Sequence, residues 1–202
     1  MPRKSKRKTA LNSEIGSTVY KLTQGEGRPF LCNGSPTDCK IALVGINPGT
    51  PVSFWDCWSV ENGCDKETWL ANYLDLHGRL KPTRDRIETF CTALGKEGCL
   101  ELNLTHHFTP SESDFSREQL SDNEVFSYMV QTVQPKVLVV HGLSPTRHLE
   151  KLLSIEIPTE QLIRADYLGI RLKVYRAKSH FSRGVSRRYI RDLAELVSSE
   201  LN

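Results

Sequence analysis

The sequence lacks a long hydrophobic run. No apolar stretch among its 202 residues approaches the roughly 18 residues of a membrane-spanning helix. The N-terminal MPRKSKRK is basic, but no apolar segment follows it, so it does not resemble a secretory signal. Hydrophobic residues make up 38% and charged residues 25% of the chain, which is typical of a globular protein. We therefore expect a monomeric intracellular protein without a membrane partner, in the cytoplasm of a bacterium or the nucleus of a eukaryote.

Cysteine is absent after residue 99, so a four-cysteine iron–sulfur pattern cannot be completed late in the chain. The six cysteines of an intracellular protein are expected to be reduced thiols. Two pairs, Cys32/Cys39 and Cys57/Cys64, have six residues between partners, which is wider than the usual zinc-binding spacing of about two to four. We therefore expect neither a metal site nor a cofactor.

Acidic residues are absent from residues 171–191, which contain eight Lys and Arg side chains. Residues 3–8 contain five more, so these two segments hold 13 of the 27 basic residues. The remaining 14 are outnumbered by 24 acidic residues. Clustering of this kind is the electrostatic footprint of a polyanion-binding protein. For residues 3–8 alone, a solubilising tail or a targeting signal explains the charge equally well.

Strand and helix patterns alternate along the chain. The apolar runs at 40–46 and 135–142 are nearly continuous, as buried parallel strands require. Four strands are expected, at 40–46, 99–105, 135–142 and 170–177. Four helices are expected, at 82–98, 116–134, 144–154 and 186–201. The alternation predicts an α/β fold, a three-layer α/β/α sandwich around a central four-stranded, mainly parallel sheet.

The helix signals also include caps. Ser116 is a candidate N-cap with Gln119 in the capping-box position, and Gly95 stands near the end of the helix at 82–98. We see no internal repeat and no low-complexity linker, so we expect a basic, flexible N-terminal arm at 1–20 and a single domain at 21–202.

All four predicted strands end in polar or turn residues. The first ends in GINPG at 45–49 and the second in NLTHHFTP at 103–110. The third ends in HGLSP at 141–145, and SHFSRG at 179–184 follows the fourth. In an open α/β sheet, ligands bind at the carboxyl ends of the strands. These four stretches are therefore expected to meet at one cleft.

In order and spacing, these elements resemble the uracil-DNA glycosylase superfamily, from about residue 40 to the C-terminus. GINPG is similar to the first motif of the mismatch-specific and thymine-DNA glycosylase branch, and to the GMNPG of the single-strand-selective branch. LNLTHHFTPSESDFSREQL resembles the superfamily's middle region, and SHFSRG stands where the family has a His-Pro-Ser loop. The resemblance implies a metal-free enzyme that flips a base out of DNA and hydrolyses its N-glycosidic bond.

The resemblance also implies catalytic roles. Asn47 matches the residue that holds the attacking water; an amide has no useful pKa near neutrality, so it orients the water rather than deprotonating it. His180 matches the loop histidine that donates to the base oxygen as charge develops there. If Asn47 does not serve, Asp56 is an alternative base, and His106 or His107 could also face the cleft.

Base-binding positions follow in the same way. Asn103 matches the residue that pairs with the base edge, and the turn residues Gly45, Ile46 and Pro48 lie beside the base carbonyl. At Gly49, the uracil-specific branch has a bulky aromatic ring that excludes substituents at carbon 5. Glycine there predicts a pocket open to larger or modified bases. Phe54 and Trp55 could stack on the base, although aromatic residues beside a turn more often pack in the core.

Contacts with DNA are expected around the last loop. In His180-Phe181-Ser182, the family's proline is missing, which removes a fixed backbone angle. Phe181 or Arg183 could fill the gap left by the flipped nucleotide, but Phe181 could equally pack in the core. Further DNA-binding candidates are Ser144 at a helix start, and Ser182, Ser186 and Arg187 in the basic segment.

Two other functions fit the same cleft. The chain could be a catalytically silent nucleic-acid-binding protein of this fold, or a small-molecule α/β hydrolase. A binding protein would not need Asn47, Asn103 and His180 together, so the glycosylase is the favoured hypothesis.

Overall fold

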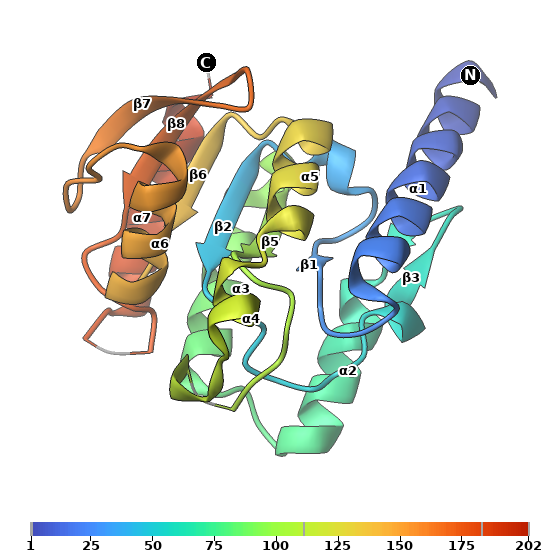
Figure 1. Ribbon diagram of the computed structural model, residues 1–202, viewed down its shortest axis with the longest axis horizontal. Helices are drawn as coiled ribbons and strands as arrows, with labels where there is room; N and C mark the ends of the chain where they lie inside the picture. Colours follow the sequence, from blue (N-terminus) through green and yellow to red (C-terminus); the bar gives the residue numbers. More distant parts are fainter. Residues whose placement is uncertain (1, 111, 183, 202) are drawn as a thin grey trace.

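A six-stranded, mostly parallel sheet forms the centre of the protein (Figure 1). The computed structural model describes residues 2–110, 112–182 and 184–201. The strand order is β1-β5-β2-β6-β8-β7; the four inner strands run parallel, and the edge strands β1 and β7 are antiparallel to their neighbours. The strands are β1 Phe30–Leu31, β2 Ile41–Gly45, β5 Cys99–Asn103, β6 Val137–Val140, β7 Leu162–Tyr167 and β8 Ile170–Arg176.

The mixed α/β class and the four predicted strands are confirmed, but the predicted number of strands is wrong. β1 has only two residues, too few for a periodic pattern, and it pairs with β5. β7 forms a hairpin with β8, and its Arg164 and Asp166 are exposed, so it lacks the continuous apolar run of the inner strands. A separate two-stranded ribbon joins β3 Trp58–Ser59 to β4 Gly63–Cys64.

Helices cover both faces of the sheet. In β2, Ile41 and Leu43 belong to the core formed with α3 and α7, whereas Ala42 and Val44 belong to the core under α1, α5 and α6. Figure 1 shows α5 and α6 in front of the sheet and α7 behind it. The arrangement is compatible with a three-layer α/β/α fold. The helices are α1 Pro2–Thr23, α2 Lys66–His77, α3 Pro82–Leu94, α4 Arg117–Ser121, α5 Glu124–Val133, α6 Leu143–Leu153 and α7 Arg187–Ser199, with short 3₁₀ turns η1 Pro36–Asp38, η2 Trp55–Cys57, η3 Gly95–Glu97 and η4 Glu112–Asp114.

Helix boundaries follow the sequence signals closely. Ser116 and Gln119 form the expected capping box at the start of α4, and Gly95 follows the last residue of α3. The predicted helix at 116–134 is divided at Asp122 and Asn123 into α4 and α5. α2 was not predicted, because its exposed and buried positions do not form one apolar stripe.

The N-terminal segment is a helix rather than an arm separate from the domain. Ile15 and Val19 of α1 are fully buried in the same core as β2 and α5. The expected boundary at residue 20 therefore does not divide the structure, and the second half of α1 packs as part of the domain. None of the described helices is long and apolar enough to cross a membrane. All six cysteines lie in the described part of the chain and are free thiols.

Candidate active site

A cavity of about 250 Å³ lies at the carboxyl ends of the parallel strands. The turn after β2, the end of β5, the start of the loop after β6 and the loop after β8 all contribute to its wall. Seven predicted residues line it together, namely Gly45, Ile46, Asn47, Pro48, Gly49, Asn103 and His180. The convergence expected from the strand ends is therefore present, and the cavity is smaller than the roughly 300–1,000 Å³ of a drug-sized ligand site.

The turn at 45–49 is held by the segment that continues β5. The backbone N–H groups of Leu104 and Thr105 donate to the carbonyls of Gly45 and Ile46, at 3.0 and 3.1 Å. Gly49 has a φ of +59°, and a Cβ at this position would have no atom within 4 Å. The cavity is thus open beside Gly49.

Asn47 is oriented by the loop after β5. Its Nδ2 donates to the carbonyl oxygen of Thr109 at 3.0 Å and lies 3.4 Å from the Thr109 hydroxyl. Because the amide nitrogen has these partners, Oδ1 is the atom of Asn47 that can accept a hydrogen bond from a ligand or water.

Asn103 ends β5 and is buried at the floor of the cavity. Its Nδ2 is buried and has no hydrogen-bond partner among the described residues. A Cβ at position 45 would lie 3.0 Å from the Asn103 Oδ1, so glycine at the end of β2 leaves room for this amide. A buried amide donor without a partner is costly, and a bound ligand with an acceptor edge would satisfy it.

His180 is held in one tautomer by Ser182. The backbone N–H of Ser182 donates to His180 Nδ1 at 3.1 Å, and the Ser182 hydroxyl lies 2.6 Å from the same nitrogen. A backbone N–H can only donate, so Nδ1 is an acceptor and the neutral ring has its proton on Nε2. Nε2–H is then the donor that His180 can present to a ligand.

His141 directly follows β6 and packs beside His180. The centroids of these two rings are 4.9 Å apart, and the His141 ring also stacks on Phe181 with the centroids 4.3 Å apart. Burial, together with the neighbouring His180, lowers the pKa of His141 to about 3. His141 is therefore neutral at physiological pH and adds no charge to the cavity wall.

Gly142 gives His180 the space it occupies. Its φ is +98°, and a Cβ there would lie 2.9 Å from the His180 Cδ2. With its ψ of 155°, this backbone conformation is essentially confined to glycine. We therefore expect Gly142→Ala to displace the His180 ring and to destabilise the protein by more than the roughly 1–3 kcal/mol of the backbone strain alone. Urea unfolding and the His180 ring resonances in NMR spectra measure the two effects.

Gly169→Ala is the matched control, because Gly169 has a φ of +80° and a Cβ there would have no atom within 4 Å. This variant also places an alanine at a positive φ, but without the clash, so it should leave the His180 resonances in place. Equal effects of the two substitutions would contradict a contact between position 142 and His180.

A buried cluster of charged side chains, which no local sequence pattern predicts, borders the cavity. Glu101 in β5 accepts two hydrogen bonds from Arg84, each 2.7 Å long, and lies 2.7 Å from the Lys66 Nζ. Arg28 lies 3.5 Å from the same carboxylate. Glu88 adds a second carboxylate, 3.0 Å from Lys66. Three cations thus meet two anions, and we call these five residues the buried ion cluster.

The pKa shifts in the buried ion cluster follow from this arrangement. Burial alone would raise the pKa of Glu101, but Arg84, Lys66 and Arg28 lower it well below its usual range. Burial alone would lower the pKa of Lys66, but Glu101 raises it above its usual range. Burial lowers the pKa of Arg28 to about 10, against the opposing effect of Glu101. Arg28 is the only cation of the cluster whose pKa is lowered, because Glu101 offsets its burial less than it offsets that of Lys66 and Arg84. The Nε and Nη1 of Arg28 make no hydrogen bond in the described structure.

The aromatic rings in the cavity are not the predicted ones. Phe54 is fully buried against Phe30 and Trp58, and Trp55 packs on Tyr20 and Phe54. Neither lines the cavity, because the chain after Pro51 turns into the core. Trp69 and Tyr73 line it instead. Both belong to α2, the helix that the sequence pattern did not reveal.

The predicted DNA-contacting residues that the structure describes do not line the cavity. Phe181 is fully buried against His141 and Phe90. It therefore packs in the core, as one of the two alternatives predicted, and is not an exposed wedge. Ser186 caps α7 by accepting from the Tyr189 N–H, and Arg187 pairs with Asp85. Ser144 is in the first turn of α6, and Ser182 holds His180. Arg183 lies outside the described residues.

The alternative bases also lie elsewhere. Asp56 is exposed in η2, and neither it nor His106 or His107 lines the cavity. The candidate site is therefore formed by Asn47, Asn103 and His180, with the buried ion cluster and two α2 rings around them. Comparison of the sequence with protein-family models and with curated proteins gives no match.

Proposed function

We propose that the protein is a DNA glycosylase that hydrolyses the N-glycosidic bond of a damaged, mismatched or modified base. The observation that supports this most is the meeting of Asn47, Asn103 and His180, from three separate segments of the chain, in one small cavity with the turn at 45–49. Each of these three side chains can play a part that base excision needs. The motifs that contain them occur in an order similar to that of the uracil-DNA glycosylase superfamily.

The proposed chemistry divides between the sugar and the base. A base can reach the cavity only after leaving the duplex stack. Asn47 Oδ1 then accepts from the attacking water and orients it toward the sugar carbon. The C–N bond breaks through an oxocarbenium-like state, and the bonding electrons leave with the base. Water then adds to the sugar carbon, and the proton that it loses passes to the departing base anion, directly or through solvent. His180 Nε2–H stabilises the negative charge on the base oxygen.

Recognition of the base is assigned to Asn103 and to the open side of the cavity. The Nδ2 of Asn103 donates to the base edge, which gives this buried amide the partner it otherwise lacks. The space beside Gly49 supports a substrate with a substituent larger than the hydrogen of uracil. Trp69 is fully buried with Arg28 and Arg84 over its ring, so Tyr73 is the aromatic residue proposed to contact the flipped ring.

Affinity for the DNA backbone is assigned to the basic residues of 171–191. Lys178, Arg188 and Arg191 are exposed, and the latter two belong to α7. Because phosphate binding releases counterions, affinity should fall steeply as salt concentration rises.

A small-molecule enzyme is the second candidate. Arg28 lines the cavity with two nitrogens that make no hydrogen bond in the described structure, which favours a ligand with an anionic or acceptor-rich group. A hydrolase acting on such a molecule would use the same cavity without binding DNA.

A panel of base-modified oligonucleotides tests the proposal. Single strands and duplexes that contain uracil, mismatched thymine, 5-substituted pyrimidines or hypoxanthine are incubated with the protein and then treated with alkali. We expect strand breaks at one or more bases larger than uracil. Cleavage confined to uracil would refute the open pocket, and no cleavage of any substrate would favour the alternatives.

A further inference from the structure

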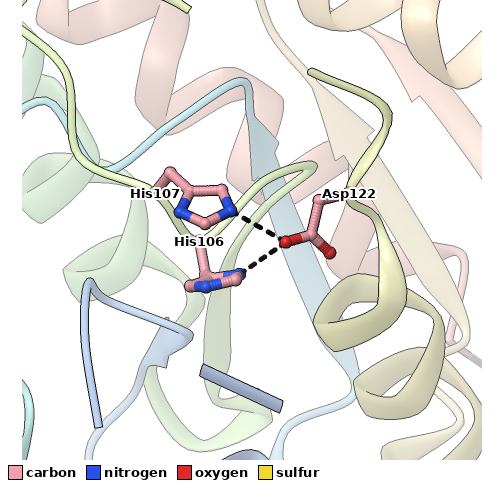
Figure 2. Close-up of side chains that lie close together, drawn as sticks. All are labelled: His106, His107 and Asp122. Carbon is pink, nitrogen blue, oxygen red and sulfur yellow. Dashed lines mark hydrogen bonds and ion pairs between the residues drawn. The ribbon is translucent and has the colours of Figure 1, made fainter. Parts of the chain in front are cut away.

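Three potential metal ligands meet outside the candidate active site. His106 and His107 lie in the loop after β5, and Asp122 stands between α4 and α5. Figure 2 shows both imidazole rings directed at one carboxylate oxygen. The Asp122 Oδ2 lies 2.8 Å from His107 Nε2 and 3.6 Å from His106 Nδ1. We call these three residues the histidine–aspartate cluster.

His106 supplies a second, independent observation. The residue is 3% exposed, and its buried Nδ1 makes no hydrogen bond within the described part of the chain. Buried polar atoms almost always have a partner, so each exception needs an explanation. This nitrogen points at the space between His107 and Asp122 (Figure 2). A bound cation there would give it a partner.

We propose that the histidine–aspartate cluster binds a divalent transition-metal ion, with Zn²⁺ as the ion that its donors fit best. Two imidazole nitrogens and one carboxylate oxygen are a common zinc donor set, and a fourth position remains for water. Their candidate ligand atoms all lie within 4.8 Å of one another. Tetrahedral coordination at zinc bond lengths needs separations of roughly 3.3–3.5 Å, so the 2.8 Å contact opens by about half an ångström.

The ion would fasten the loop after β5 to the start of α5. The same loop is joined elsewhere by main-chain bonds: the N–H of Arg28 donates to the His106 carbonyl at 3.1 Å. Thr109, two residues after His107 in the chain, accepts a hydrogen bond from Asn47. The proposed ion would therefore steady the segment on which the orientation of Asn47 depends.

Metal titration of the full chain tests this proposal without DNA. Zn²⁺ is titrated against a chromogenic chelator, and Co²⁺ is used as a spectroscopic probe. We expect one Zn²⁺ per chain and visible tetrahedral Co²⁺ bands without cobalt–thiolate charge transfer. His107→Ala and Asp122→Asn should each weaken Zn²⁺ binding by at least about 10- to 100-fold, because loss of a direct ligand exceeds loss of an outer-shell partner. Both side chains are 28% exposed, so the variants should fold.

His148→Gln is the matched control, because it removes an imidazole from α6 that bonds to the Ser144 carbonyl. This variant should bind Zn²⁺ as the wild type does, and excess Mg²⁺ or Ca²⁺ should not compete, since both prefer oxygen ligands. Zinc affinity that neither cluster substitution changes would overturn the proposal, as would thiolate absorption from Co²⁺ or no binding at micromolar zinc. If this protein excises bases but does not bind zinc, the metal site is refuted and the proposed glycosylase function is not.

Discussion

Replacing Glu101 with Ala is expected to lower the free energy of unfolding by about 3–5 kcal/mol. The substitution removes the carboxylate that Arg84, Lys66 and Arg28 share and leaves their charges buried beside only Glu88. Protein stability totals roughly 5–15 kcal/mol, so the loss is a large fraction of the whole. Urea unfolding followed by circular dichroism measures it.

Glu97→Ala is the control for the loss of a carboxylate in an ion pair. Glu97 pairs with Lys40 at 2.7 Å, but Lys40 is half exposed to water. Exposed pairs contribute little to stability, so this variant should unfold close to the wild type. Similar unfolding midpoints for the two variants would show that the buried ion cluster is not held by Glu101.

The decline of the free energy of unfolding at acidic pH should also depend on the Glu101 carboxylate. Because the folded protein lowers the pKa of Glu101, its contribution is fully present above the ordinary glutamate pKa of about 4.3. The contribution is lost as the pH falls below that value toward the lowered pKa. Glu101→Gln should therefore flatten the decline of stability in acid relative to the wild type.

Replacing Asn47 with Ala is expected to reduce base excision by on the order of 100-fold or more, because misplacing a reacting group by about an ångström already has an effect of that size. Alanine removes both the acceptor that orients the water and the hydrogen bonds to Thr109. Single-turnover excision of the best substrate in the oligonucleotide panel measures the rate, and DNA affinity measured separately should change little.

Asn62→Ala is the matched control, since Asn62 is an exposed asparagine between β3 and β4. It should excise at the wild-type rate. Retention of full activity by Asn47→Ala would remove Asn47 from the proposed mechanism and leave the placement of water to another group.

The parts of the fold that could be predicted are those with a strong local pattern. β2 and β6 are buried on both faces, so their apolar runs are continuous, and the topology then brings Asn47, Asn103 and His180 to one end of the sheet. β1 and α2 have no comparable pattern. As a result, the sequence alone indicates Phe54 and Trp55 as the aromatic residues of the cavity, whereas Trp69 and Tyr73 line it.

The charged clusters could not be predicted because their members are distant in the chain. Glu101 is the only charged residue in the otherwise largely apolar strand β5, which indicates a buried partner. No sequence pattern around it identifies Arg28 or Lys66 as that partner. Likewise, Asp122 lies 15 residues after His107, which matches no common metal-ligand spacing. Tertiary packing alone brings these side chains together.

The two sheet edges also bear on self-association. An exposed edge strand offers unpaired backbone groups to other chains, and short strands or charged side chains discourage that pairing. One edge here is a strand of only two residues, and the other presents Arg164 and Asp166 to solvent. Both edges therefore oppose extension of the sheet into a neighbouring molecule, which protects the chain against aggregation through β-strand addition.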